Sequence, residues 1–331
     1  MQVIRVKPTE NLQSILSNLS EPTHILLEKG VFLQKIVIPP LCVKLSGSGR
    51  ETTVISNADY AKKLHADGKE FNTFRTFTVC VTGEKCVIEN LTIENAATSP
   101  EKNGQCVALS VHTKEFYGRN LNLKSTQDTL FCAPFPDDLV ARYSGLTADP
   151  VSHETYYDGF IPRDQLYIEG GSVQIFEDCN IWGNVDFIFG GAEAYFKNCK
   201  LISLAEVRGN GYVAAPSHSL ENKRGFSFID CAFKNGGAEK GSVYLARPWR
   251  DFGKCNFINC TLEEHINGEL FDKWNDTYRD KTARFGYFGL ENTGDADYEK
   301  SAVGWANKLT KPQADDIINN FILRKKKILC E

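Results

Sequence analysis

The hexapeptide Phe196-Lys197-Asn198-Cys199-Lys200-Leu201 contains a pattern that returns several times along the chain. An apolar residue and a variable residue precede Asn or Asp. Cys or Leu comes next, and a variable and an apolar residue end the pattern. Further copies begin at Ile88, Phe176, Phe228 and Phe257, and a shorter form occupies residues 120–123.

The Cys or Leu of each copy serves as a marker for the spacing of the repeat. Successive markers lie 30, 58, 20, 32 and 29 residues apart. Short β-prone runs with such a period are typical of a solenoid, and no helical pattern alternates with them. We therefore predict an all-β fold, a right-handed parallel β-helix of the pectin-lyase-like type, with turns stacked at roughly 4.8 Å. The markers are Leu91, Leu121, Cys179, Cys199, Cys231 and Cys260.

The whole chain, residues 1–331, is expected to form one β-helix domain. The 58-residue interval predicts one turn plus a loop insertion at about residues 131–163. Long loops in compact domains are usually functional or disordered, and the aromatic residues favour an ordered flap. They are Phe135, Tyr143, Tyr156, Tyr157 and Phe160, among several Pro and Gly.

Both ends of the chain contain a short helical pattern. Apolar residues at i, i+3, i+4 and i+7 predict a helix near residues 12–19, followed by strands at 24–27 and 30–32. A second helix is predicted after Pro312, and we expect it to cover the open end of the solenoid. The apolar faces are Leu12, Ile15, Leu16 and Leu19 in the first helix, and Ile317, Ile318, Phe321 and Ile322 in the second.

Composition limits the cellular setting and the partners. The net charge of −4 and pI of about 6.0 give no reason to expect nucleic-acid binding, and no apolar run is long enough to span a membrane. No leader pattern follows Met1, and the 11 Cys are an odd number, so we expect reduced thiols in a cytoplasmic monomer, or a secreted protein if a leader has been removed. Marker Cys residues are expected to stack inside the coil, because no metal-binding Cys spacing occurs.

An Asp lies inside the apolar run Asn184–Gly190 and must be paired, hydrogen-bonded or functional, because burying a bare charge is costly. Asp186 follows marker Cys179 by seven residues, and Asp128 follows marker Leu121 by seven. If the markers stack, the two carboxylates lie roughly 5–6 Å apart on neighbouring turns. Their pKa values should then separate, giving one acid and one base or nucleophile.

Three more polar side chains fall near this pair. Gln105 and Arg247 lie 14 and 16 residues after their markers, which predicts nearly the same phase on a later strand. An Arg beside one carboxylate would keep it ionised, and the amides of Gln105 and Gln127 could stabilise an oxyanion. Gln127 adjoins Asp128, so both reach one site only at a strand end or bend.

Each of these residues also has a structural interpretation. The glutamines could form a stacking ladder, and Asp128 could be an Asx-turn residue. Arg247-Pro248-Trp249 could be a surface corner with cation–π packing. Other nucleophile systems are poorly supported, because the sequence contains no GxSxG, HExxH, Walker A or dinucleotide fingerprint.

Four ordered segments resemble the signature motifs of pectin methylesterases (pectinesterases, a carbohydrate esterase family). The likeness extends over about residues 25–310 and includes Gly30–Phe32, Thr73–Arg75 and residues 286–294. In this sequence Ala246 replaces a family Gly, Cys106 an Ala and Phe32 a Tyr. The four segments are Gln105-Cys106-Val107-Ala108-Leu109, Gln127-Asp128-Thr129-Leu130, Asp186-Phe187-Ile188-Phe189-Gly190 and Leu245-Ala246-Arg247-Pro248-Trp249.

The resemblance implies hydrolysis of the C6 methyl esters of homogalacturonan or methylated oligogalacturonides, without a metal or an organic cofactor. It gives Asp186 as nucleophile and Asp128 as general acid and then base. Gln105 and Gln127 would stabilise the oxyanion, and Arg247 would hold Asp186. The residues expected to contact the sugar chain are Thr73, Phe189 and Trp249.

Three other functions remain open from the sequence. A different esterase or a thioesterase could use the same scaffold with a reshaped site. A non-catalytic carbohydrate-binding β-helix is a second alternative, although binding alone needs no paired carboxylates. A pectate lyase is a third, and it would need a cluster of Ca²⁺-binding acids that the sequence does not suggest.

Overall fold

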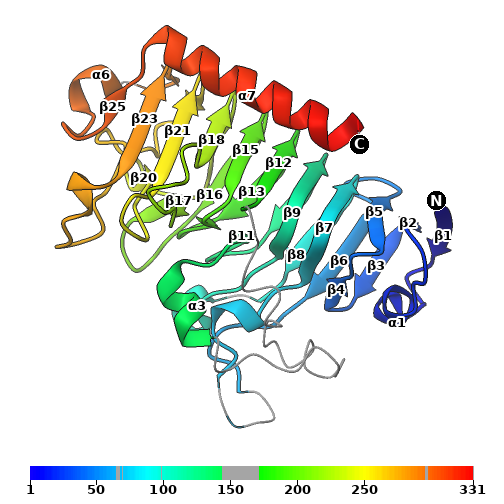
Figure 1. Ribbon diagram of the computed structural model, residues 1–331. Helices are drawn as coiled ribbons and strands as arrows, with labels where there is room; N and C mark the ends of the chain where they lie inside the picture. The colour runs from blue at the N-terminus through cyan, green and yellow to red at the C-terminus, as the bar shows by residue number, and fades with distance from the viewer. Residues whose placement is uncertain (65–67, 69, 98, 144–170, 295–296, 331) are drawn as a thin grey trace.

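Parallel strands stack along one axis in the computed structural model, which describes residues 1–64, 68, 70–97, 99–143, 171–294 and 297–330 (Figure 1). One sheet has 16 strands and the other has 9. The long path of the first contains β1 (Gln2–Val6), β2 (Thr23–Leu27), β5 (Cys42–Gly47), β7 (Val79–Glu89), β9 (Leu109–Arg119), β12 (Val173–Glu177), β15 (Glu193–Lys197), β18 (Phe226–Ile229), β21 (Lys254–Ile258), β23 (Arg284–Phe288) and β25 (Asn307–Lys308).

A second row of strands branches from this sheet, and the other sheet supplies a third row. The branch contains β4 (Ile36–Ile38), β11 (Leu130–Cys132), β14 (Ile188–Gly190), β17 (Gly211–Pro216) and β20 (Val243–Ala246). The third row contains β3 (Gly30–Leu33), β6 (Thr53–Asn57), β8 (Thr92–Asn95), β10 (Asn122–Lys124), β13 (Asn180–Gly183), β16 (Lys200–Leu204), β19 (Ala232–Gly236), β22 (Thr261–Leu262) and β24 (Glu291–Asn292).

Each complete turn of the coil uses one strand from each row, as β14, β15 and β16 do before β17 begins the next turn. The pairs β14–β17 and β15–β18 are parallel and in register, so equivalent residues stack directly on neighbouring turns. The parallel β-helix predicted from the repeat is confirmed.

The Asn or Asp of the hexapeptide makes the bend between the first and third rows. These residues have a left-handed backbone, for example φ 54° at Asn198 and φ 56° at Asp178, a conformation that short polar side chains tolerate. Neighbouring bends are joined by side-chain hydrogen bonds, since the Nδ2 of Asn198 donates to the Oδ1 of Asp178 at 2.6 Å and Asn120 donates to Asn90 at 2.7 Å. The repeated polar residue therefore has a conformational cause.

The interior of the coil is a set of stacked apolar ladders. Phe176, Phe196, Phe228 and Phe257 follow one another with ring centroids 4.6–5.0 Å apart and nearly parallel planes. The marker cysteines form a second ladder, and each buried thiol donates weakly to a carbonyl of the preceding turn, as the Sγ of Cys231 does to Phe196 at 3.2 Å. The distance between successive Phe rings is close to the distance between adjacent strands.

Helices lie at both ends of the chain. Helix α1 (Leu12–Ser17) is confirmed, and it buries Leu12 and Leu16 in the main core. Among the described residues, no helix combines the length and apolarity needed to cross a membrane. In the described ranges the other helices are η1 (Thr73–Arg75), α2 (Pro100–Asn103), α3 (Asp137–Tyr143), η2 (Arg279–Lys281), α6 (Tyr298–Ser301) and α7 (Lys311–Cys330).

The predicted C-terminal helix exists, but its expected position at the open end is wrong. Helix α7 runs across the strands of the first row, from above β23 toward β9 (Figure 1). Phe321 packs there against Tyr195, with ring centroids 6.0 Å apart. The outer faces of these strands are apolar. The helix therefore covers them and not the open end of the solenoid. Ile322, expected on the apolar face, is 53% exposed and points away from the sheet.

The predicted insertion at 131–163 is described only in its first part. Residues 131 and 132 belong to β11, and α3 follows at Asp137. Residues 144–163, which include most of the expected flap, lie outside the described residues.

Candidate active site

The register of the second row brings Asp128 and Asp186 together. Leu130 of β11 pairs with Ile188 of β14, so the two residues that precede each of these strands lie level with one another. The backbone N–H of Asp128 donates to the carbonyl of Val185 at 3.1 Å, which continues the same register. The prediction of a shared phase on neighbouring turns is confirmed. Each Asp is 8% exposed, so both lie just beneath the surface.

The two carboxyl groups differ in their surroundings. Burial raises the pKa of Asp186, but the Arg247 guanidinium opposes that rise with two hydrogen bonds, Nε to Oδ1 at 2.8 Å and Nη2 to Oδ2 at 2.6 Å. Burial and the negative charge of Asp186 raise the pKa of Asp128 well above its usual range. The geometry therefore supports one ionised and one protonated carboxyl group in contact with solvent.

Arg247 is itself held between two aromatic rings. Its guanidinium carbon lies 3.7 Å from the centroid of Tyr212 and 4.0 Å from that of Trp274. A planar cation between two π-faces is oriented as well as stabilised. The corner formed by Arg247, Pro248 and Trp249 thus points its charge inward to Asp186 rather than to solvent.

Gln127 and Asp128 share one site because the backbone bends between them and β11. Asp128 has φ 63° and lies two residues before the strand begins. The amide of Gln127 lies close enough to the carboxyl group of Asp128 to lower its pKa, against the larger effect of burial. The backbone bend that Gln127 and Asp128 need in order to reach one site is therefore present.

Gln105 lies level with Gln127. The prediction that Gln105 and Arg247 have nearly the same phase in their turns is wrong. The N–H of Cys106 donates to the carbonyl of Gln127 at 3.0 Å, which places the two glutamines on adjacent turns. Counting from marker Leu91 fails here because α2 lengthens the preceding loop. Arg247 lies further along its strand row than the position level with Gln105, because it follows Ala246, which pairs with Ala214. Gln105 and Gln127 are therefore level with one another on neighbouring turns, and Asp128 directly follows Gln127 in the sequence.

Aromatic residues extend from the carboxyl pair along the second row. Phe189 follows Ile188 on β14 and packs edge-on against Trp249, with ring centroids 5.7 Å apart. The ring centroids of Phe74 and Phe189 lie 6.2 Å apart, and Thr73 precedes Phe74 in η1, so Thr73 lies near the same aromatic residues. The three residues predicted to contact a sugar chain therefore gather on one side of the coil.

A family model covers almost the whole chain and carries the same name as the resemblance. The model for Pectinesterase matches residues 6–135 and 149–325. The chain belongs to the pectinesterase family. It is accordingly a carboxylic ester hydrolase with pectinesterase activity.

Individual pectinesterases agree with this assignment. Among curated proteins, Pectinesterase QRT1 of Arabidopsis thaliana is 27% identical over 89% of this chain and 67% of its own length, and Probable pectinesterase 8 of the same plant is 29% identical over 93% and 69%. Among solved structures, a pectin methylesterase in complex with hexasaccharide VII has a TM-score of 0.72 and 23% identity, covering 93% of this chain and 90% of its own. That likeness establishes the shared parallel β-helix.

Several residues of this pectinesterase site were not predicted from the sequence. Tyr212 and Tyr244 lie level with the two Asp residues on the next turns, with stacked rings 5.7 Å apart. Both follow a marker Cys by 13 residues, so a search for equal offsets would have found them as a pair. Trp274 and Arg208 lie in loops without a repeat signal, and only the structure brings them to the site.

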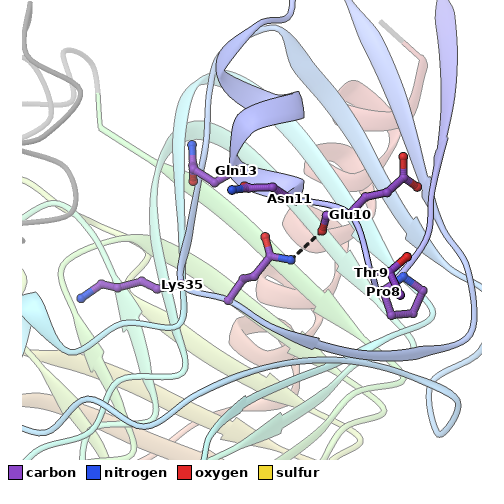
Figure 2. Close-up of a pocket in the computed structure, with 7 residues that line it drawn as sticks. Pro8, Thr9, Glu10, Asn11, Gln13 and Lys35 are labelled. Carbon is purple, nitrogen blue, oxygen red and sulfur yellow. Dashed lines mark hydrogen bonds between the residues drawn. The ribbon is translucent and has the colours of Figure 1, made fainter.

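Two hollows lie away from the carboxyl pair of this pectinesterase. A hollow of about 420 Å³ beside α1 is lined by Pro8, Thr9, Glu10, Asn11, Gln13, Gln34 and Lys35 (Figure 2). Its polar groups support the fold, since Gln34 donates to the carbonyl of Glu10 and Asn11 caps α1. A larger one, of about 1290 Å³, lies between α3 and α7, where Arg250 pairs with Asp138 and Arg324 with Glu193.

Proposed function

We propose that this chain hydrolyses the C6 methyl esters of homogalacturonan or of methylated oligogalacturonides through Asp186 and Asp128. The observation that carries the proposal is the asymmetry of the carboxyl pair: Arg247 bonds both oxygens of Asp186, while burial and the neighbouring charge raise the pKa of Asp128. Such a pair supplies a nucleophile and an acid at the same pH.

In the first step, the carboxylate of Asp186 attacks the ester carbonyl carbon and forms an acyl-enzyme anhydride. The bond between the acyl carbon and the methoxy oxygen breaks. Asp128 gives its proton to the departing methoxy oxygen, so methanol leaves and Asp128 becomes ionised. The proposal uses the raised pKa of Asp128, because an acid that is ionised at working pH would have no proton to donate.

In the second step, ionised Asp128 removes a proton from water, and the resulting hydroxide attacks the acyl carbon. The anhydride bond breaks, which releases a free galacturonate carboxyl group and restores the carboxylate of Asp186. Asp128 again holds the proton. In both steps the amides of Gln105 and Gln127 donate to the oxygen that becomes negative, an interaction worth about 10²–10³ in rate for one donor.

Sugar binding is assigned to Thr73, Phe189 and Trp249, which lie along one side of the coil. Aromatic faces suit the apolar faces of pyranose rings, and Trp249 is half-buried with its ring plane steeply inclined to that of Phe189. A pectin methylesterase has been solved with hexasaccharide VII, which supports an extended oligosaccharide as the substrate of this chain.

Substitution of Asp186 by Asn tests the nucleophile. Asn has nearly the same shape but cannot attack the ester, so we expect methanol release to fall to background while the β-rich circular dichroism spectrum is kept. Asp178→Asn is a matched control, since Asp178 lies on the same turn at a bend that also accepts Asn. Turnover near the wild-type value in a folded Asp186→Asn protein would refute the assignment.

The substrate class is tested with highly methylated pectin and short methylated oligogalacturonides measured side by side. Methanol release from both is expected, and the ratio of the two rates gives the preference for polymer or oligomer. Release of a thiol from an acyl thioester, with no methanol from either pectin substrate, would show that the substrate is a thioester and not a pectin methyl ester.

A further inference from the structure

An ion-paired arm lies next to one of the two glutamines. The segment between β16 and β17 contains Glu206 and Arg208, whose Nε and Nη2 donate to the two carboxylate oxygens of Glu206 at 2.8 and 2.7 Å. The backbone N–H of Arg208 donates to the same carboxylate at 2.7 Å. The side chain of Glu206 is only 4% exposed, against 38% for Arg208. The acid is thus a fixed anchor, and it orients the guanidinium above it.

The guanidinium of this arm reaches Gln127. Its Nη2 donates to the Oε1 of Gln127 at 3.1 Å. A guanidinium can only donate, so its contact selects the oxygen end of the amide. The amide N–H₂ then faces the opposite direction, toward Asp128, whose pKa the nearby amide lowers. One contact therefore decides which end of the amide the reacting groups meet.

We propose that Arg208, anchored by Glu206, is a positioning residue that orients the Gln127 amide with its N–H₂ toward the carboxyl pair. The inference rests on the proposed function, in which Gln127 donates to the oxyanion. Without the arm, the amide could rotate by half a turn about its last bond at little cost and present its oxygen to a developing negative charge. In this proposal Arg208 acts through Gln127 and not on the reacting atoms.

The geometry differs from that of an ordinary surface ion pair. Exposed pairs contribute little to stability and tolerate replacement. Here the acid is nearly buried, and the cation contacts a residue 81 positions away in the sequence. The charge of Arg208 also lies close enough to Asp128 to lower the pKa of that carboxyl group, against the larger effect of burial. Both observations connect the arm to the reaction centre.

A double-mutant cycle tests the proposal. We expect R208A to lower kcat for methanol release about 10-fold with KM changed less than about 3-fold, because an oxyanion donor is misoriented rather than removed. In a Gln127→Ala background the same substitution should have no further effect, since the residue it orients is gone. R324A is the matched control, because Arg324 pairs with Glu193 in the same two-bond manner and with similar exposure, far from the site.

Other results overturn the inference. Equal losses of kcat from R208A in the wild-type and Gln127→Ala backgrounds would show that Arg208 acts independently of the amide. A rise in KM confined to partly de-esterified pectin would show that it binds a substrate carboxylate instead. R208K, which keeps a donor, should recover part of kcat. E206Q should lower kcat as R208A does, and an unchanged kcat in E206Q would show that Glu206 does not anchor the guanidinium.

A neutron crystal structure of R208A tests the same geometry without turnover, because neutrons distinguish the amide oxygen from the N–H₂ group, which X-rays at ordinary resolution do not. The amide of Gln127 should rotate or become disordered relative to the wild-type protein, and an unchanged orientation would refute the inference. If the wild-type protein releases no methanol, the proposed function fails, whereas the orientation of Gln127 in the two crystals still decides the positioning role. Should R208A not fold, E206Q provides the comparison.

Discussion

Asp128 and Asp186 have the same side chain and the same register, yet their environments give them different chemistry. Both are buried to the same degree, so desolvation disfavours both anions. The difference is the guanidinium of Arg247, which satisfies both oxygens of Asp186 and leaves Asp128 beside an anion. One cation placed on one member of a pair is enough to separate the roles.

Substitution of Arg247 by Lys should therefore change the pH profile as well as the rate. Lys offers a point charge without the two parallel donors and without the stacking between Tyr212 and Trp274. The pKa of Asp186, already raised by burial, should rise further. We expect the acidic limb of kcat/KM to move to higher pH by about one unit, the equivalent of about 1.4 kcal/mol, and kcat to fall at least 10-fold.

Methanol release measured from pH 4 to pH 9 checks this prediction. The acidic limb reports protonation of Asp186 and the alkaline limb ionisation of Asp128. An unchanged acidic limb in Arg247→Lys would mean that the guanidinium does not hold the nucleophile ionised.

The carboxyl pair could be predicted from the sequence because both Asp residues follow their markers by the same seven residues. The segment from marker to strand has the same length in those two turns. Residues at equal offsets from their markers therefore occupy equivalent positions on neighbouring turns. The same count failed for Gln105, whose loop includes α2. Trp274 could not be found by any count, because its loop has no counterpart in the other turns.

At the scale of the element, the bend residues control how each turn enters the next. Asn198 has φ 54°, where a Cβ atom clashes with the backbone and only Gly avoids the strain. Asn198→Ala and Asn198→Gly both lose the hydrogen bond to Asp178, so the difference between them isolates the backbone cost. We expect the Ala protein to be about 1–2 kcal/mol less stable than the Gly protein by urea unfolding. Equal stability would show that the bend relaxes.

Helix α7 makes a second prediction, because its two faces differ sharply. Phe321 is 5% exposed against the first-row strands, while Ile322 is 53% exposed. Phe321→Ala should lower the unfolding free energy by about 3 kcal/mol through lost burial and a cavity, and Ile322→Ala should change it by less than about 0.5 kcal/mol. Thermal and urea midpoints of the two proteins check this. Similar losses would mean that the helix packs through another face.

The sequence predicted that this helix forms but not where it lies. Apolar periodicity reports that one face is buried, and it does not name the surface that buries it. Strand β12 shows the difficulty, since Ile175 faces outward to α7 and the adjacent Phe176 faces the interior. A strand that is apolar on both faces has no alternation to reveal its covered outer side.

At the scale of the whole molecule, the stacked turns bury titratable groups that no chemistry uses. His218 is 1% exposed, its Nδ1 accepts from the N–H of Lys254 at 3.0 Å, and its Nε2 bonds the carbonyl of Ala192 at 2.9 Å. Burial lowers the pKa of His218 to about 3, and nearby Arg284 and Lys254 also oppose its charge. His265, fully buried, has its pKa lowered by burial to about 4. Both imidazoles are neutral in the folded protein.

These histidines should make the coil less stable in mild acid. An unfolded His has a pKa of about 6.5, so between pH 6.5 and the folded value the unfolded chain binds more protons than the folded chain. The stabilisation is complete above pH 6.5 and is lost as pH falls through that window. For His218 the loss from pH 7 to pH 5 is about 2 kcal/mol, and His265 adds a similar amount.

Urea unfolding of wild type and His218→Gln at pH 7 and pH 5 tests this contribution. Gln keeps one donor and one acceptor but has no proton to gain, so the variant should be less stable at pH 7 and lose about 2 kcal/mol less than the wild type on acidification. Carboxylates do not mimic the result, because both proteins contain the same ones and their contributions cancel in the comparison, whether their pKa values are lowered, as for Asp59 and Glu177, or raised, as for Asp128. Parallel losses in both proteins, or a His218 resonance that titrates near pH 6.5 in the folded state, would show that this imidazole is not held neutral by the coil.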